Sequence, residues 1–331
     1  MDHLDIVICT HNRAWALTKV LDRLAEQRAV TGFSWAVLVV DNASSDDTAV
    51  QVARFASELN LRYVHEPKLG LTHARLRGVL ETSGEWIAFV DDDNLVDSGW
   101  VAAIVDGIRA HPDAGGFGGR VVLDWEVRPP AVVDSFGFCF AEQDLGHEPL
   151  EVESLVGAGM VLSRKALQVS GWVAEPLLAD RIGKSLVSGG DVEMALRVRG
   201  AGYALRYEPN AVLQHLMPAG RSTPTYFLRI NRALGRTSAI VSLLSWGGEF
   251  EDWRRSALLT SKERVRDAVA GLVWSLRKGR GRLAAVAWLA LAIGHREGIA
   301  QAGRMEPARR KALLGAAVRS IPSDAQAGKP K

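Results

Sequence analysis

The first part of the chain alternates short apolar runs with longer segments of helical spacing. The runs over 4–10, 35–40, 61–65 and 86–90 are rich in β-favouring residues and are bounded by polar ones, as buried strands are. Between them, residues 13–27, 47–59 and 71–81 repeat apolar side chains at helical intervals. This alternation predicts an α/β fold with a mostly parallel central sheet flanked by helices.

The middle of the chain continues the pattern less regularly. We expect helices over 97–110 and from 189 to about 200, and strands over 115–125, 154–163 and 203–208. Residues 126–152 carry prolines and acidic residues with no sustained period, which predicts a variable loop. We assign residues 1–220 to one α/β domain.

Beyond residue 220 the pattern becomes helical. Residues 265–276 and 283–293 are apolar stretches, separated by the basic turn from Arg277 to Arg282. An eleven-residue helix spans only about 16 Å, whereas a bilayer core measures about 30 Å, so we expect no membrane crossing by 283–293. This C-terminal region, 221–331, is either a helical hairpin packed on the first domain or a helix pair lying in a membrane interface.

Charge divides the chain at the same place. Residues 1–220 hold 19 Lys+Arg and 30 Asp+Glu, a net charge of −11, whereas residues 221–331 hold 21 and 8, a net charge of +13. A basic region of this kind favours an anionic partner. The sequence shows no nucleic-acid recognition module, so we expect an anionic membrane surface and no nucleic acid.

Composition excludes other classes. With 331 residues, 47% hydrophobic and 24% charged, the chain is globular rather than disordered. Its two cysteines, Cys9 and Cys139, are far apart, which supports neither a disulfide framework nor a zinc site. The acidic N-terminus passes directly into a strand without the features of a signal peptide, and we expect a cytoplasmic protein.

Three consecutive carboxylates, Asp91, Asp92 and Asp93, follow the apolar run over 86–90. On an extended chain Asp91 and Asp93 project to one face and Asp92 to the other. Two carboxylates on one face suit Mn²⁺ or Mg²⁺, which completes its coordination with water and substrate phosphates. The alternative is a solvated acidic turn that caps the next helix.

Polar residues follow the other strands too, and together they carry a resemblance. The segments are Thr10-His11-Asn12-Arg13, Asp41-Asn42-Ala43-Ser44-Ser45-Asp46, Gly70-Leu71 with Arg75 and Gly78, and Phe89 to Asp93. In order and spacing they resemble family 2 glycosyltransferases, which have the GT-A fold. The resemblance fades beyond Arg221.

The resemblance implies roles for these positions. It implies nucleotide-sugar binding by Thr10, Asn12, Arg13, Asp41, Ser44, Arg75, Asp91 and Asp92. Asp93 would bind the metal that bridges the donor diphosphate, with His215 near it. On local grounds alone, Arg75 is as well explained as a solvated helix charge, and His215 as a structural histidine.

Inverting sugar transfer also needs a carboxylate that takes the proton of the acceptor hydroxyl. Asp191 opens the helix after Gly190 and resembles the Asp of the family's Glu-Asp motif, in which Gly190 replaces the Glu. Glu193 is the rival base, and only one of the two should face the site. The alternative makes Asp191 an N-cap alone.

The resemblance also implies a sugar pocket beside the strand over 154–163. Gly157 and Gly159 interrupt this strand, which favours a bulge or a ligand lying against the backbone. Trp172 downstream is a candidate for stacking on an acceptor, although a tryptophan in this context is more often part of the core.

The sequence therefore predicts a metal-dependent inverting glycosyltransferase. It would use Mn²⁺ or Mg²⁺ and transfer a sugar from a nucleotide-diphosphate donor, expected to be a UDP-sugar, to a glycan or lipid-linked acceptor at the cytoplasmic face of a membrane. Nucleotidyl transfer is disfavoured because the segment from Thr10 to Arg13 is not a Gly-rich phosphate loop. A non-catalytic nucleotide-sugar-binding or membrane scaffold protein is the alternative, with Gly190 as its only hint.

Overall fold

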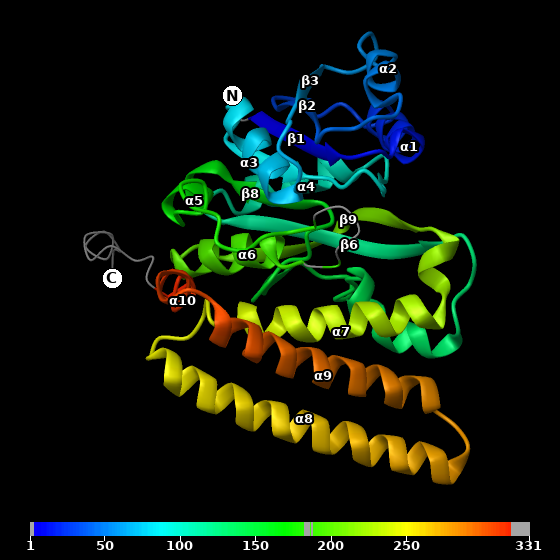
Figure 1. The fold of residues 1–331 in the computed structure, drawn as a ribbon. Coiled ribbons are helices and arrows are strands. Elements are labelled where there is room, and N and C mark those ends of the chain that lie inside the picture. The colour runs from blue at the N-terminus through cyan, green and yellow to red at the C-terminus, as the bar shows by residue number, and fades with distance from the viewer. Residues whose placement is uncertain (1–2, 182–185, 187, 319–331) are drawn as a thin grey trace.

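The first strands and helices alternate as predicted. The computed structural model describes residues 3–181, 186 and 188–318. Parallel strands β1 to β4 are joined by helices α1 to α3 (Figure 1): β1 (His3–Thr10), α1 (Ala14–Ala25), β2 (Ser34–Asp41), α2 (Thr48–Ala53), β3 (Leu61–His65), α3 (Leu71–Glu81) and β4 (Trp86–Phe89). Only α2 is much shorter than the helix predicted over 47–59. The chain after Ala53 forms turns, and these turns place the side chains of Phe55 and Leu59 in the core.

The rest of the sheet is mixed. β8 (Met160–Ser163) pairs antiparallel with β4 and with β6 (Gly116–Trp125), and β6 runs parallel to β9 (Leu205–Met217). β5 (Asn94–Val96) and β7 (Leu150–Val152) pair antiparallel with β9. The order among the described strands is β3-β2-β1-β4-β8-β6-β9-β5. The α/β class with a helix-flanked central sheet is thus confirmed, and parallel pairing holds throughout the first four strands.

Several elements of the middle region differ from their predicted bounds. The strand expected over 154–163 begins only at Met160, because Gly159 adopts a positive φ of 69°. The loop over 126–152 contains the 3₁₀ segment η1 (Ala131–Phe140) and β7. Helices α4 (Trp100–Ala110), α5 (Arg164–Val169) and α6 (Gly190–Gly200) cover the sheet.

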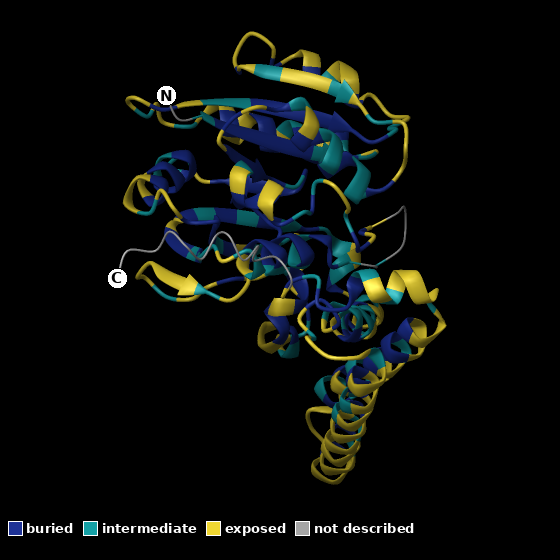
Figure 2. Ribbon diagram, turned by 90° about the vertical axis from the view of Figure 1, so that its left-hand side faces the viewer, coloured by how far each residue is buried: buried dark blue, intermediate teal, exposed yellow. Residues whose placement is uncertain are grey.

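The C-terminal helices are longer than their apolar stretches suggest. After η2 (Ala219–Ser222) and α7 (Pro224–Val241), α8 (Phe250–Lys278) and α9 (Arg282–Arg304) form a hairpin that is followed by α10 (Pro307–Leu313). α9 lies between α7 and α8, and the outer side of α8 is exposed (Figures 1 and 2). Both halves of the expected hairpin are therefore present.

The prediction that the stretch over 283–293 is too short to cross a membrane assumes a helix of eleven residues, and this assumed length is wrong. α9 has 23 residues rather than eleven, because Gly294, His295 and Glu297 continue the helix against α7. Among the described helices it alone has the length and apolar composition of a membrane span, and 39% of its most apolar stretch of 18 residues is buried. This burial reflects packing on α7 and α8.

α7 and α9 touch through glycines. A methyl group added at Gly294 would lie 1.9 Å from the carbonyl oxygen of Arg232, and one at Gly235 would lie 2.0 Å from that of Leu291. Glu297 of α9 adds ion pairs to Arg232 and Arg236 of α7. The two helix backbones can approach this closely only because both faces lack side chains at the crossing.

Two of the apolar cores combine residues from both sides of residue 220. Phe136 and Met217 pack with Phe227 and Ile230 of α7, and Leu177 packs with residues of α7 to α10 and the segments between them. The C-terminal helices therefore share cores with the sheet-bearing part of the chain. The division into residues 1–220 and 221–331 stays a prediction, and residues 319–331 lie outside the described part of it.

Candidate active site

The carboxyl ends of the parallel strands meet at one edge of the sheet, where ligands of such folds bind. A cleft of about 290 Å³ opens there. The predicted residues that line it are Thr10, Arg13, Arg75, Asp91, Asp92, Asp93, Gly157, Asp191 and His215. Cys9 also lines the cleft, and burial raises the pKa of its thiol to about 12, so the sulfur stays protonated and is no nucleophile at neutral pH.

Asp92 contacts residues at the end of β1 and in the loop that follows it. One of its oxygens accepts a hydrogen bond of 2.8 Å from the Thr10 hydroxyl, and the other lies 2.7 Å from Arg13 Nη1. Burial raises the pKa of this carboxyl, with neighbouring Asp93 acting in the same direction and Arg13 against it. Asp92 therefore fixes Thr10 and Arg13 at the floor of the cleft.

Asp93 is surrounded by basic groups. Its Oδ2 lies 2.7 Å from Arg13 Nη1 and 3.3 Å from Arg221 Nη2, and its Oδ1 lies 3.5 Å from His215 Nε2. Burial alone would raise the pKa of Asp93, but His215, Arg13 and Arg221 together hold it well below its usual range. The carboxylate is thus ionised at neutral pH.

The donor set beside Asp93 suits a divalent cation. His215 Nδ1 lies 2.9 Å from the carbonyl oxygen of Phe140, which holds the proton on Nδ1 and leaves the Nε2 lone pair facing Asp93 and 3.3 Å from Arg221 Nη1. Among the described residues no group of three or more His, Cys, Asp or Glu side chains is arranged so that it could hold a metal ion. Two protein ligands suffice for Mg²⁺ or Mn²⁺ when phosphates and water complete the shell, so these residues fit such an ion.

Arg75 is buried between two carboxylates. Its Nη1 lies 2.7 Å from Asp180 Oδ2, and its Nη2 lies 3.6 Å from Asp91 Oδ1. The side chain of Arg75 is only 4% exposed, whereas that of Asp91 is 34% exposed. Arg75 is therefore a buried cation of the cleft rather than the solvated helix charge of the alternative.

Asp191 stands in the first turn of α6 and faces the cleft. Its Oδ2 accepts a hydrogen bond of 3.1 Å from the Gly157 amide, and its Oδ1 accepts one of 2.9 Å from the amide of Val192. A methyl group added at Gly157 would lie 2.5 Å from Asp191 Oδ2, so the glycine makes room for this carboxylate. The predicted glycine and the predicted base are thus parts of one arrangement.

The missing side chain at Gly190 leaves a space that another acid fills. A methyl group added at Gly190 would lie 2.9 Å from Asp180 Oδ2. Asp180 is 5% exposed, and burial raises its pKa, although Arg75 acts in the opposite direction. The Thr72 hydroxyl accepts a hydrogen bond of 3.0 Å from the Asp180 amide and fixes this position.

Asp41, Asn12 and Ser44 do not line the cleft. The oxygens of Asp41 accept hydrogen bonds from the Ser44 amide and the Tyr63 hydroxyl, and the Ser44 hydroxyl accepts one from the Asn12 amide. These contacts lock the loops after β1 and β2 together. In this structure both Asp41 oxygens are therefore bonded within the protein, and Asn42 is the residue of this loop that lines the cleft.

Trp172, Glu193 and Gly159 lie away from the cleft. Trp172 is 1% exposed in an apolar core, so it offers no face to a sugar and follows the core alternative. Glu193 is fully buried, pairs with Arg197 at 2.9 Å and accepts hydrogen bonds from the amides of Leu177 and Leu178. It cannot reach an acceptor, which leaves Asp191 as the base candidate. A side chain at Gly159 would meet Leu213 instead of a ligand.

Comparison with known proteins decides the family. The model of glycosyl transferase family 2 matches residues 5–170, which include the cleft-forming strands and Asp91 to Asp93. The chain belongs to this family. A glucosyl-dolichyl phosphate glucuronosyltransferase of Haloferax volcanii is 26% identical over 41% of this chain and 45% of its own length. A validoxylamine A glucosyltransferase of Streptomyces hygroscopicus is 34% identical over 36% and 28%. The chain thus spans less than half the length of these relatives.

Solved structures share the fold of this glycosyltransferase family member. A mannosyltransferase from Pyrobaculum calidifontis, solved with GDP-Man and Mn²⁺, has a TM-score of 0.53 at 19% identity and covers 98% of this chain and 82% of its own. TarS 1–349 of S. aureus, solved with UDP-GlcNAc, has a TM-score of 0.52 at 15% identity and covers 94% and 84%. The GT-A type fold is therefore confirmed.

Two residues of the candidate site, Asp180 and Arg221, cannot be recognised as site residues from the sequence. Asp180 lies in a segment without periodicity, and its place depends on Arg75, more than a hundred residues earlier. Arg221 lies at the edge of the basic region and was counted only as part of its charge. Both are defined by partners distant in sequence.

Proposed function

We propose that this family 2 member transfers a sugar, with inversion, from a nucleotide-diphosphate donor to an acceptor hydroxyl. The observation that carries the proposal is the position of Asp191, a carboxylate held by the Gly157 amide on the same cleft as Asp91 to Asp93. One cleft thus brings together a candidate base and a candidate cation ligand. Metal-assisted inverting transfer uses the first to take the acceptor proton and the second to stabilise the leaving diphosphate.

In the proposed step the acceptor oxygen attacks the anomeric carbon on the face opposite the leaving group. The new carbon–oxygen bond forms as the bond to the diphosphate breaks, and Asp191 accepts the proton of the acceptor hydroxyl. The nucleoside diphosphate leaves with the bonding electron pair. Asp191 receives two amide hydrogen bonds, which fix the orientation of its carboxylate for this transfer.

The diphosphate end of the cleft neutralises the leaving group. Asp93 and His215 would hold a Mn²⁺ or Mg²⁺ ion, which supplies Lewis-acid stabilisation of the departing phosphate charge. Arg13 and Arg221, which contact Asp93 here, add cationic groups beside the same position. The donor is proposed to be a UDP-sugar, and Thr10, Arg75, Asp91 and Asp92 would shape its site.

We assign to Asp180 the role of the family's Glu, which Gly190 replaces in this chain. Its carboxylate occupies the space beside Gly190 and is bonded to Arg75, so it both balances the buried cation and presents an oxygen near Asp191. Asp180 is a positioning residue in this proposal. It explains how the site tolerates glycine at position 190 without becoming a non-catalytic binding protein.

The acceptor is proposed to be a glycan or a lipid-linked glycan. One relative's name includes dolichyl phosphate and another is a succinoglycan biosynthesis protein of Rhizobium meliloti, 28% identical over 33% of this chain. We further propose that residues 1–220 form the catalytic unit, and that residues 221–331 hold it to the cytoplasmic face of an anionic membrane. Exposed Leu259, Trp274 and Leu276 of α8, among many basic residues, support this attachment.

The variant Asp191→Asn tests the proposed base. The amide keeps the shape and can still accept the Gly157 hydrogen bond, but it cannot take a proton at neutral pH. We expect the release of nucleoside diphosphate from a nucleotide sugar to fall by roughly 10²–10⁴-fold. The affinity for the donor, measured from thermal stabilisation by the nucleotide sugar, should stay within about twofold of that of the wild type. Near-normal release by Asp191→Asn would remove the base assignment.

A further inference from the structure

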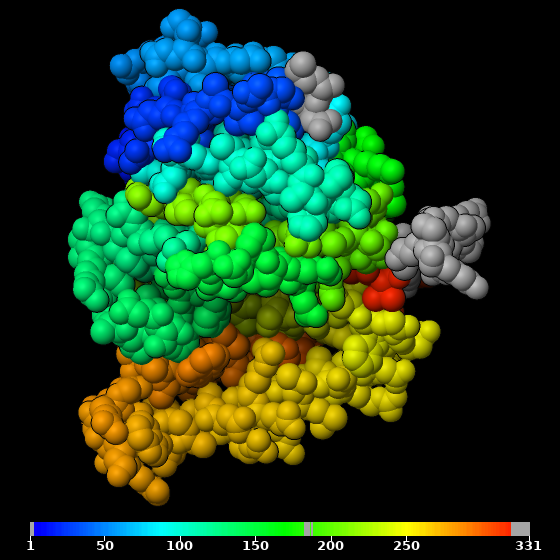
Figure 3. Space-filling view, turned by 180° about the vertical axis from the view of Figure 1, so that it is seen from behind, coloured from blue at the N-terminus to red at the C-terminus, as the bar shows by residue number. Residues whose placement is uncertain are grey.

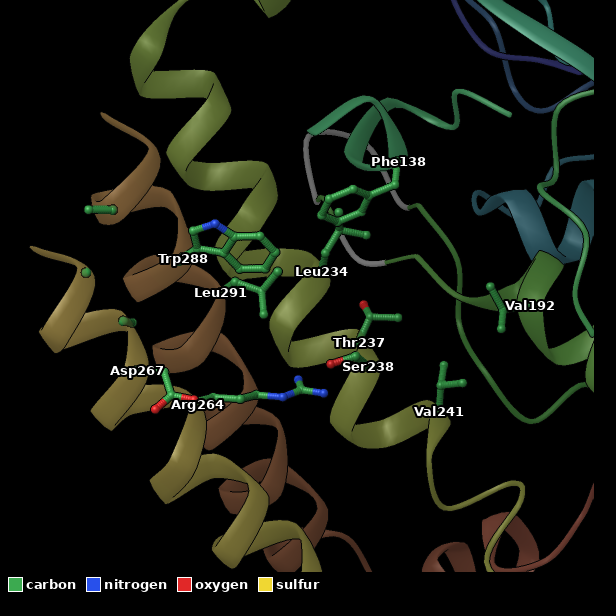
Figure 4. A pocket seen from close by; sticks show the side chains of 13 residues that line it. Phe138, Val192, Leu234, Thr237, Ser238, Val241, Arg264, Asp267, Trp288 and Leu291 are labelled. Carbon is green, nitrogen blue, oxygen red and sulfur yellow. The ribbon is translucent and has the colours of Figure 1, made fainter. Parts of the chain in front are cut away.

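A second cavity lies among the C-terminal helices, apart from the cleft. It has a volume of about 850 Å³ and a predominantly apolar lining (Figure 4). Protein interiors are close-packed, and few voids exceed the size of a water molecule. A space of this size lies within the range of pockets that bury small ligands, about 300–1,000 Å³.

Three helices each turn one face toward this cavity, which we call the helical cavity because α7, α8 and α9 line it. α7 contributes Leu234, Thr237, Ser238 and Val241, and α8 contributes Arg264, Asp267, Ala268 and Gly271, in both cases at the spacing of a single helix face. α9 contributes Ala285, Trp288 and Leu291. In Figure 4, Trp288 and Leu291 lie opposite Phe138 of η1, and Figure 3 shows the surface hollowed between these helices and the body of the protein.

The helical cavity adjoins the candidate active site. Val192, which lines it, directly follows Asp191 in α6. Thr237, which also lines it, donates a hydrogen bond of 3.2 Å to the carbonyl oxygen of Ser188, a residue of the cleft. A single layer of chain therefore separates the proposed base from the apolar space.

We propose that the helical cavity holds the hydrocarbon chain of a lipid-linked acceptor whose hydroxyl reaches Asp191. This inference rests on the proposed function and adds the place where the acceptor's lipid is bound. Burial of an apolar chain against this apolar lining is favourable and does not depend on direction. The basic C-terminal region, with a net charge of +13, complements the phosphate that links such a lipid to its sugar.

Apart from the charged Arg264 and Asp267 of α8, the polar groups of the lining are two hydroxyls that are bonded within the protein, which favours a lipid over a peptide. The Ser238 hydroxyl is bonded to the carbonyl oxygen of Gly235 at 2.9 Å, and the Thr237 hydroxyl to that of Ser188. A peptide in the cavity would bring amide and carbonyl groups that need partners when buried, whereas a hydrocarbon chain needs none. At its solvent side the cavity is flanked by half-exposed aromatic rings, Phe138 and Trp288, stacked at 6.4 Å.

Binding of two isoprenoid phosphates of different length tests the inference. Farnesyl phosphate and isopentenyl phosphate share a headgroup, so a difference in affinity reports the chain. We expect the full-length protein to bind farnesyl phosphate at least tenfold more tightly. Equal affinities would overturn the inference, because the cavity would then contribute nothing.

A blocking variant and its matched control locate the chain. Gly271 lines the cavity, and a methyl group there meets nothing within 4 Å, so Gly271→Trp can fill the space without a clash at the backbone. Gly303 on α9 is equally open but lies outside the lining, so Gly303→Trp is the control. We expect Gly271→Trp to weaken farnesyl phosphate binding at least tenfold and Gly303→Trp to leave it unchanged.

Each other outcome counts against the lipid. Unchanged farnesyl phosphate binding by Gly271→Trp would place the lipid elsewhere, and a dimer of the wild type that Gly271→Trp dissociates would assign the cavity to a second copy. UDP-sugar binding is measured on the same proteins. Its retention without lipid binding overturns this inference alone, whereas its absence from the wild type contradicts the proposed function.

Discussion

At the scale of single residues, the carboxylates differ in how their positions are determined. Asp91, Asp92 and Asp93 follow a buried strand, and the edge at which parallel strands end is predictable, so the sequence indicated their location correctly. From the sequence alone Glu193 is a rival base, because nothing in the local pattern shows that its side chain turns inward to pair with Arg197. Asp180 could not be found, since only the folded chain brings it to Arg75.

A carboxylate exchange tests the role given to Asp180. Asp180→Ala should lower nucleoside diphosphate release by about 10- to 100-fold, because the acceptor end of the site loses its second acid and Arg75 loses the nearer of its two carboxylate partners. Adding Gly190→Glu to this variant returns a carboxylate to the same space, which Asp180 no longer fills. We expect the double variant to recover at least tenfold.

The rescue separates positioning from stability. If Asp180 only stabilised the fold, Gly190→Glu would not restore turnover, and the double variant would stay as slow as Asp180→Ala. Gly190→Glu alone should be slower than the wild type, because two carboxylates would crowd one space. Steady-state release by all four proteins under one condition decides between these outcomes.

At the scale of elements, the periodicity of the sequence predicts which helices and strands exist better than it predicts the direction of a strand or the length of a helix. β1 to β4 and their helices follow the predicted order, but the apolar run that forms β8 carries no sign of its antiparallel direction. α9 extends beyond its apolar run because Gly294 and Glu297 contact α7, which local pattern does not reveal. The C-terminal helices were underestimated for this reason.

The glycine crossing of α7 and α9 yields a paired stability prediction. Gly294→Ala puts a methyl group 1.9 Å from the Arg232 carbonyl oxygen, so a helix backbone must move, and we expect a loss of about 1–3 kcal/mol in the free energy of unfolding. Gly303→Ala, in the same helix but in open space, should instead gain about 0.5–1 kcal/mol from helix propensity. Urea unfolding measures both, and equal effects would mean that α9 does not pack on α7 as described.

At the scale of the whole molecule, an acidic sheet-bearing body meets a basic helical region. Residues 1–220 carry a net charge of −11 and residues 221–331 one of +13, and α8 exposes several apolar side chains. The ring centroid of Trp274, which is half-exposed, lies 5.7 Å from the guanidinium carbon of Arg280. Such a helix combines the two attractions of an interfacial helix, electrostatic and apolar.

Flotation with liposomes tests this attachment. The full chain should associate with anionic vesicles at low salt and much less with neutral ones, and salt should weaken the association because the contributing charges are exposed. The double variant Leu259→Glu with Trp274→Glu changes two exposed positions of α8 and should reduce flotation severalfold without affecting UDP-sugar binding. Flotation that ignores lipid charge would contradict the attachment.

The central claim is that Asp93 and His215 bind a divalent cation that a nucleotide sugar needs. Because Asp93 also pairs with Arg13 and Arg221, Asp93→Asn is the suitable change, since alanine would leave two partly buried cations without this partner. The decisive measurement is thermal stabilisation by UDP-sugars with Mn²⁺ and with chelator, for the wild type and Asp93→Asn. The account predicts stabilisation that requires Mn²⁺ in the wild type and is lost in Asp93→Asn. Equal stabilisation in chelator, or in Asp93→Asn, would contradict it.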